Sequence, residues 1–346
     1  MICSRMNFVL KHVYKQPIWN CRLCSKISQE IDEKDPAPLF FDQHVQELLT
    51  TLTRINYDKV FATRKDGTKL VVPKYKFMTD EELKNAQVEI AVKARGRIQM
   101  PPVVKMRSDE EVVLSNDPAL QGFQMHNIVV TDISFGNQNR NRLIVIREPN
   151  GKLRHAKSDE RRRVNQVYFP INGREIHIPN MFYDPHFKDL LERQEFEFIL
   201  DRTCTQFEPD DPEYHRITKE VYEWVNKLKK FDILRSTRHF GPFVFNLAWK
   251  NDICPLLMEL ITNKNIKEAA ALIRLYHRLH PEAKSHAEPI LDDIELVLTY
   301  AKLDSPEPHK LTRAIVNYNK LRKEEEEIKL GVIKAHGLVD DTDKQT

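Results

Sequence analysis

Residues 140–174 are the part of the sequence best suited to bind phosphate, because arginine is concentrated there. This basic segment contains ten lysines and arginines and three acidic residues, so its net charge is +7 over 35 residues. Eight of the ten cations are arginines, whose planar guanidinium groups bind phosphate oxygens through two parallel hydrogen bonds. Each neutralised phosphate releases counterions, which favours a nucleic-acid backbone as the partner. The alternatives are a solvated face and a docking site for an acidic protein.

Seven cations of the basic segment are candidates for RNA contact. Two further arginines come from an aromatic stretch, residues 234–245, whose apolar side chains are expected to pack in a core. We rank these two arginines second. The nine candidates are Arg140, Arg142, Arg154, Lys157, Arg161, Arg162, Arg163, Arg235 and Arg238.

An acidic segment, residues 195–223, follows the basic one. It contains nine acidic residues and three lysines or arginines, so its net charge is −6. The two segments could pair with each other, or they could face RNA and protein respectively; the sequence does not decide between these arrangements. Four acids crowd together within residues 208–213. They could bind magnesium, but acids at a helix N-terminus, which the helix dipole favours, are the better interpretation.

The remaining reactive residues give no positive argument for catalysis. The nine glycines are spread too widely to form a dinucleotide-binding turn, a phosphate-binding loop or a nucleophile elbow. His277 and His280 lie three residues apart before a proline, where histidines in the last turn of a helix oppose its dipole. We therefore expect no enzymatic activity, no cofactor, no metal site and no small-molecule substrate.

The first 29 residues have the composition of a mitochondrial transit peptide. They carry five lysines and arginines and no acid, since Glu30 is the first acidic residue, and such basic, acid-free starts are typical of import signals. An ordinary basic arm is the alternative. Three of the five cysteines lie in this segment, including Cys21 and Cys24, whose spacing we interpret as coincidental. Loss of the segment would change the net charge from +3 to −2.

The elements that must position these residues are mostly helices. Asp42 is expected to cap one helix, and Thr79 with Glu82 forms a capping box for a second, which Gly96 and the Pro101-Pro102 pair should end. Asp184 and Asp211, each followed by proline, are expected to cap two more. Further helices are predicted at 253–263, 265–279, 286–303 and 307–329.

The middle of the chain changes to a β pattern. Short runs rich in β-branched residues occur at 127–134 and 142–148, and a Pro-Asn-Gly turn signal at 149–151 leads into a further strand. Additional strands are predicted at 166–169 and 174–178, with a short helix capped by Ser158 before them. No apolar run approaches the ~18 residues that a membrane-spanning helix requires, so we expect no membrane insertion.

These patterns predict a mainly α (α+β) fold, with helical hairpins in the C-terminal half and a small antiparallel β-hairpin unit in the middle. The expected organisation is a transit peptide, a helical and extended N-terminal segment, a basic β-hairpin unit, a helical domain and a polar tail. Their bounds are 1–29, 30–125, 126–182, 183–331 and 332–346.

Several strings, in order along the chain, resemble the mitochondrion-specific small-subunit ribosomal protein family numbered twenty-two. They are FMTDEELKNA, MPP at 100–102, VTDISFG, LIVIREPNGKLR, QVYFP, QFEPDDPEY, LRSTRHFG and LYHRLHP, and the resemblance runs from about Leu39 to Pro281. It implies a peripheral structural constituent of the mitochondrial small ribosomal subunit in the matrix. The implied partners are the small-subunit rRNA and neighbouring ribosomal proteins. A helical RNA-binding assembly factor of the same subunit is the alternative.

Overall fold

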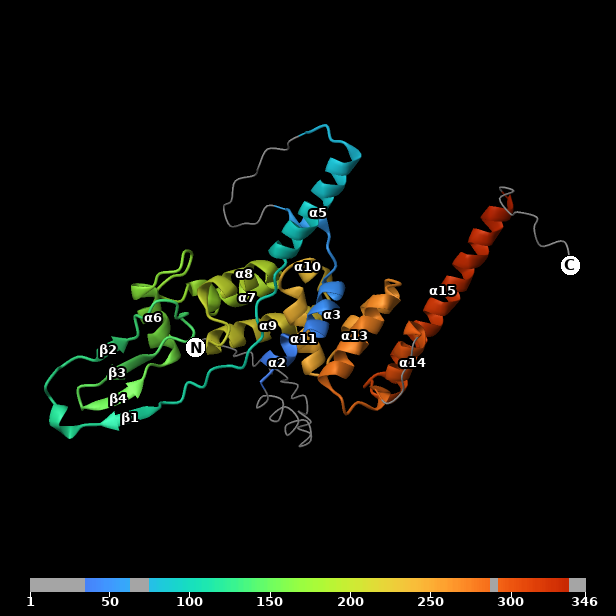
Figure 1. Cartoon of the computed structure of the whole chain (residues 1–346). Coiled ribbons are helices and arrows are strands. Elements are labelled where there is room, and N and C mark those ends of the chain that lie inside the picture. Colours follow the sequence, from blue (N-terminus) through green and yellow to red (C-terminus); the bar gives the residue numbers. More distant parts are fainter. Residues whose placement is uncertain (1–34, 63–74, 287–291, 336–346) are drawn as a thin grey trace, which may run out of the picture. The chain divides into compact units, whose positions relative to one another are not determined.

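The computed structural model describes residues 35–62, 75–286 and 292–335 (Figure 1). The expected transit peptide, with Cys21 and Cys24, lies outside these residues, as does the end of the polar tail from 336 onward. Within the described residues, no helix is both long enough and apolar enough to cross a membrane.

The described N-terminal helices are α2 (Ala37–Phe40), α3 (Gln43–Thr53), α4 (Tyr57–Val60) and α5 (Asp80–Arg97). Asp42 caps α3 by accepting a hydrogen bond from the His44 amide at 3.4 Å. Thr79 and Glu82 form the predicted capping box of α5. Both predicted helix starts are confirmed, and α5 ends at Arg97, between Gly96 and the Pro101-Pro102 pair that were expected to stop it.

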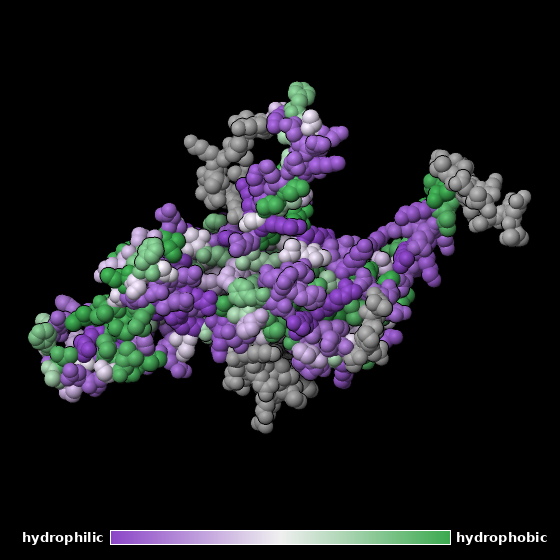
Figure 2. All heavy atoms as spheres, viewed as in Figure 1, coloured by the Kyte–Doolittle hydropathy of each residue, from purple (hydrophilic) through white to green (hydrophobic). Residues whose placement is uncertain are grey.

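A four-stranded antiparallel sheet occupies the middle of the chain (Figure 1). Its strands are β1 (Val113–Asn116), β2 (Ile128–Thr131), β3 (Ile144–Arg147) and β4 (Lys152–His155), in the order β1-β4-β3-β2. Helix α6 (Ser158–Tyr168) follows and covers one face, where Ile144 and Ile146 form a small core with Ala156 and Val164. Hydrophobic side chains also gather on the exposed surface over the strands (Figure 2).

Three local predictions in this region are wrong. The predicted strand at 166–169 lies largely in the last turn of α6. Ser158 is the first helical residue rather than the cap, because Glu160 reaches back to the Lys157 amide at 2.9 Å. Residues 174–178 form no strand, because the Gln206 side chain hydrogen-bonds both the amide and the carbonyl of Glu175, at 2.9 and 2.8 Å.

Helices make up most of the chain beyond residue 183. They are α7 (His186–Glu192), α8 (Phe196–Gln206), α9 (Pro212–Leu228), α10 (Phe231–Leu234), α11 (Phe240–Trp249), α12 (Cys254–Thr262), α13 (Ile266–Leu279), α14 (Asp293–Leu303) and α15 (Pro308–Ala335). Short 3-10 turns occur at Pro118–Leu120, Asn180–Phe182 and Lys284–His286. The mainly α fold with a small antiparallel sheet is confirmed.

The two Asp-Pro predictions have different outcomes. Asp211 caps α9, accepting from the Glu213 amide at 2.9 Å, with Pro212 as the first helical residue. Asp184 caps nothing, because α7 begins at His186, and its carboxylate instead pairs with Lys188 at 2.6 Å.

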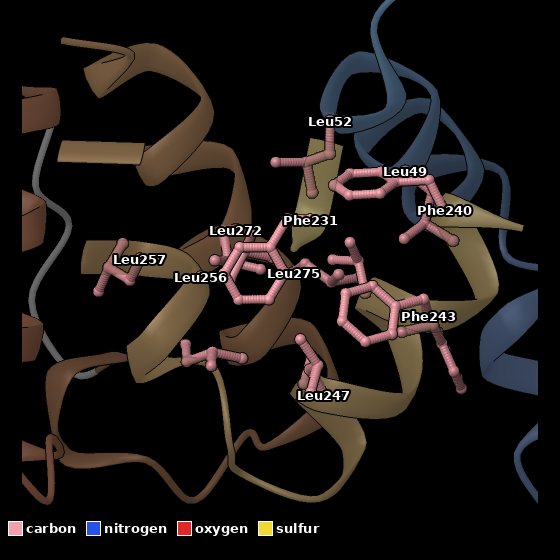
Figure 3. Close-up of a cluster of buried hydrophobic side chains, with 14 of the residues drawn as sticks. Leu49, Leu52, Phe231, Phe240, Phe243, Leu247, Leu256, Leu257, Leu272 and Leu275 are labelled. Atoms are coloured by element: carbon pink, nitrogen blue, oxygen red, sulfur yellow. The ribbon is translucent and has the colours of Figure 1, made fainter. Parts of the chain in front are cut away.

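The main hydrophobic core lies among α3 and α7–α15 (Figure 3). Leu49 from α3 packs with Phe240 and Phe243 from α11 and with leucines of α12 and α13. Helix α3 contacts both α11 and α13, so a segment far upstream in the sequence completes the core of the C-terminal helices. Burial of each large apolar side chain contributes on the order of 2 kcal/mol.

Candidate nucleic-acid interface

The basic and acidic segments meet where α6 packs beside the N-terminus of α9. Arg162 of α6 donates a hydrogen bond to Asp211 at 3.0 Å, and the two side chains are only 5% and 8% exposed. Burial raises the pKa of Asp211, although Arg162 and the Glu213 amide favour its ionised form. This ion pair, between residues 49 positions apart, therefore uses one RNA-contact candidate inside the protein.

The other acids of the 208–213 cluster are also paired with arginines. Asp210 accepts from Arg107 Nε at 3.0 Å and lies 3.7 Å from the Arg140 guanidinium. Glu208 pairs with Arg174 at 2.7 Å. Arginines therefore occupy the carboxylates that could have formed a magnesium site. Among the described residues, no group of histidine, cysteine and acidic side chains is arranged to hold a metal ion.

Arg154, on β4, and Arg142, just before β3, are both buried. Arg154 hydrogen-bonds Glu160 at 2.8 Å and Glu148 at 2.7 Å, and these bonds raise its pKa. The Arg142 guanidinium stacks 3.5 Å from the centroid of the Phe169 ring and donates to the Asp132 carbonyl at 2.6 Å. Each of these arginines stabilises the local chain path.

Arg161 is also used internally, but by carbonyl groups rather than by carboxylates. It donates to the backbone oxygens of Arg142 at 2.9 Å and Arg140 at 3.1 Å. Burial lowers its pKa. Arg161 thus holds the segment before β3 against α6.

The two second-rank candidates lie in the helical core. Arg235 is 8% exposed and pairs with Glu259 at 2.7 Å. Arg238 donates to Asp201 at 2.8 Å, and the same carboxylate accepts from buried His239 at 2.9 Å. Their guanidinium groups therefore cross-link elements that are distant in the sequence.

Three of the nine candidates keep substantially exposed charged groups, and all three lie on or beside α6. Lys157 is exposed, and the described residues offer it no carboxylate within ion-pair distance. Arg163 is 53% exposed, and within the described part of the chain its one ion-pair partner is Asp159, four residues earlier on the same helix. Arg140 is 39% exposed. Arg147 belongs to the basic segment but is not one of the nine candidates. Like Lys157, it has no carboxylate partner among the described residues.

The remaining polar groups also have structural uses. His277 hydrogen-bonds Ser285 at 2.6 Å, and His280 bonds the Ala248 carbonyl at 2.9 Å.

A cavity of about 600 Å³ lies between α4, α5 and α8. Lys59 lies at its wall, but the ammonium group of Lys59 already donates to backbone carbonyls near the end of α10, including that of Ile233 at 2.7 Å.

The described residues form a mainly helical protein in which three arginines of the basic segment, Arg140, Arg162 and Arg174, pair with acids of the acidic segment. The family model of mitochondrial 28S ribosomal protein S22 matches residues 38–281. "Small ribosomal subunit protein mS22" from Mus musculus is 34% identical over 303 residues, covering 87% of this chain and 84% of that protein. The Bos taurus protein of the same name is 35% identical over 289 residues, covering 82% and 80%. The chain belongs to the mitochondrial 28S ribosomal protein S22 family, which consists of structural ribosomal proteins, and the resemblance noted in the sequence is confirmed.

Proposed function

We propose that the protein is a non-catalytic constituent of the small subunit of the mitochondrial ribosome and works in the mitochondrial matrix. Neighbouring ribosomal proteins and the small-subunit rRNA are its partners. The observation that carries this proposal is the family match over residues 38–281. The internal pairing of Arg162, Arg154 and Arg235 fits a scaffold whose own charges hold its elements together.

We further propose that rRNA phosphates are contacted by Lys157, Arg163 and Arg140 rather than by the whole basic segment. Lys157 and Arg163 are exposed, and Arg140, which is 39% exposed, lies 3.7 Å from Asp210, so a phosphate can approach all three without breaking a short, buried ion pair. A buried arginine such as Arg162 would have to leave its carboxylate unpaired, which costs several kcal/mol. The proposal therefore divides the nine candidates into three RNA contacts and six structural groups.

The salt dependence of rRNA binding tests this division. Each phosphate contact contributes roughly 0.7–0.9 to the slope of log K against log salt concentration. Three contacts predict a slope of about −2 to −3, whereas nine would give about −6 to −8. The measurement uses the purified full chain and small-subunit rRNA. A slope steeper than about −5 would contradict the three-contact proposal.

A matched pair of variants assigns the contacts. Lys157→Gln combined with Arg163→Gln should reduce the slope by about 2 units without changing thermal stability. Arg193→Gln is the control, since Arg193 is 67% exposed and pairs with Asp189 in the same i,i+4 arrangement as Arg163 with Asp159. An equal effect of the control would show that the three residues have no special role.

Gradient fractionation of mitochondrial ribosomes tests membership of the subunit. A constituent should be present in equal amount to other small-subunit proteins in translating ribosomes. Presence only in immature particles would instead identify an assembly factor.

A further inference from the structure

One face of the four-stranded sheet is covered by α6, and the opposite face is open. Residues directly opposite each other in antiparallel strands point to the same side. Because Ile144 and Ile146 point toward α6, the pairing registers place six alternating residues on the other side. On β2, β3 and β4 this open face consists of Ile128, Val130, Val145, Arg147, Leu153 and His155, and Ser115 of β1 lies beside Leu153 on the same side.

The open face is apolar and accessible. Ile128 and Val130 are 38% and 55% exposed, and Val145 and Leu153 are partly exposed. The hydrophobic surface over the strands is visible in Figure 2. Contiguous apolar surface of this kind marks interaction sites in soluble proteins.

A single arginine carries the permanent charge of the open face. Arg147 lies opposite Ile128 on β2 and Leu153 on β4. Arg147 is partly exposed and has no carboxylate within ion-pair distance in the described part of the chain. Arg154, on the covered face, instead binds Glu148 and Glu160. A carboxylate brought to Arg147 would therefore meet an unpaired guanidinium group, and the attraction would strengthen as docking excludes water.

We propose that the open face docks an apolar segment of another protein of the small subunit, and that an acidic side chain of this segment pairs with Arg147. The inference rests on the proposed function for the presence of such a neighbour. RNA fits the face poorly: sheets that bind RNA stack bases on aromatic side chains, and the six residues include no phenylalanine, tyrosine or tryptophan. A second copy fits poorly too, because it would add another unpaired Arg147 and no carboxylate.

Photo-cross-linking identifies the occupant. A photoreactive amino acid is placed at Val130 in one full-length chain and at Val167 in another, and small subunits are purified from mitochondria. Val167 lies on α6 and is 59% exposed, close to the 55% of Val130. Position 130 should cross-link to a protein segment that contains aspartate or glutamate, and position 167 should not give that product. A cross-link from position 130 to rRNA or to a second copy would overturn the proposal, as would no cross-link from incorporated protein.

Substitutions test the energetics of the same contact. Val130→Asp should lower incorporation into the small subunit by about tenfold relative to Val167→Asp, because it places a carboxylate in an apolar interface. Arg147→Glu should lower it similarly, and Arg147→Lys should retain most of it. Circular dichroism and thermal unfolding verify that the variants fold.

The two proposals fail in different ways. Equal incorporation of Val130→Asp and Val167→Asp would overturn the docking proposal while leaving the ribosomal role intact. Failure of the unaltered chain to sediment with the small subunit would overturn the proposed function, and the docking proposal with it.

Discussion

Replacing Arg162 by methionine tests whether charge pairing between α6 and α9 holds the fold together. The substitution keeps a long side chain but leaves Asp211, which is 8% exposed, without its guanidinium partner. Breaking a buried ion pair by removing one partner typically costs about 3–5 kcal/mol. Asp211 keeps the Glu213 amide as a hydrogen-bond donor, which places the expected loss at the lower end, about 3 kcal/mol.

The loss should depend on pH with a defined sign. Burial already raises the pKa of Asp211 above its ordinary value of 3.8, and removal of Arg162 should raise it further. A carboxyl group whose pKa is raised by folding destabilises the folded state when it is ionised. The difference between the unaltered chain and Arg162→Met should therefore be largest at neutral pH and shrink as acidification protonates Asp211.

Thermal unfolding of the full chain provides the measurement. A loss of about 3 kcal/mol corresponds to a Tm decrease of roughly 6 °C at ~2 °C per kcal/mol for a large domain. The adjacent substitution Arg163→Met is the control, since Arg163 is 53% exposed and its pair with Asp159 is solvated. Exposed pairs contribute about 0–1 kcal/mol, so its Tm should change little.

A double substitution distinguishes the ion pair from general damage. Asp211→Asn keeps a good helix cap but removes the charge, so Arg162→Met with Asp211→Asn should recover most of the stability. If the double variant loses the sum of the two single losses, or if Arg163→Met is as harmful as Arg162→Met, the reasoning is wrong.

Two further substitutions test a turn and a buried charge network. Gly151→Ala should cost at least ~2 kcal/mol in unfolding free energy, because at φ +86° a Cβ would collide with the Asp117 carbonyl. Gly122→Ala, at φ +76° in open space, should cost only about 1 kcal/mol, and equal losses would contradict the steric argument. Burial lowers the pKa of His239, but the hydrogen bonds and charges of Asp201 and Cys204 together outweigh burial and raise the pKa above 6.5. Protonated His239 therefore contributes stability that is lost as the pH rises through the raised pKa. Asp201→Asn should therefore destabilise the protein most in mildly acidic solution, and a constant Tm difference from pH 6 to 8 would refute this.

The sequence predicted helices well where local signals agree. The Asp211-Pro212 pair and the 3.6-residue periodicity place α9, and α12 and α13 begin and end within one residue of the expected bounds. At 174–178 prediction failed because a distant side chain replaced the local bonds of a strand. The apolar alternation at 174–178 resembles a strand, but Gln206 satisfies the backbone of Glu175. A single sequence carries no signal for such a bond.

The candidate interface shows the same limit. Composition located the basic segment, but the use of each arginine depends on tertiary contacts such as Arg162 with Asp211, 49 residues apart. One hint was present in the sequence: two neighbouring segments carry nearly equal and opposite net charges. This balance does not by itself decide whether the segments pair with each other or face RNA and protein. Arg147 was not selected as a candidate, because an arginine without a carboxylate partner can be recognised only when its neighbours in the fold are known.

The charge pairs also decide how the sheet is held. The small core around Ile144 and Ile146 is separate from the main helical core, and ion pairs such as Arg162 with Asp211 and Arg107 with Asp210 connect the two regions. Ion pairs fix geometry through directional hydrogen bonds but stabilise less than apolar burial. Arg162, which composition assigned to RNA, therefore helps to fix α6 and the sheet against the helices, and its loss should weaken docking at the open face as well as stability.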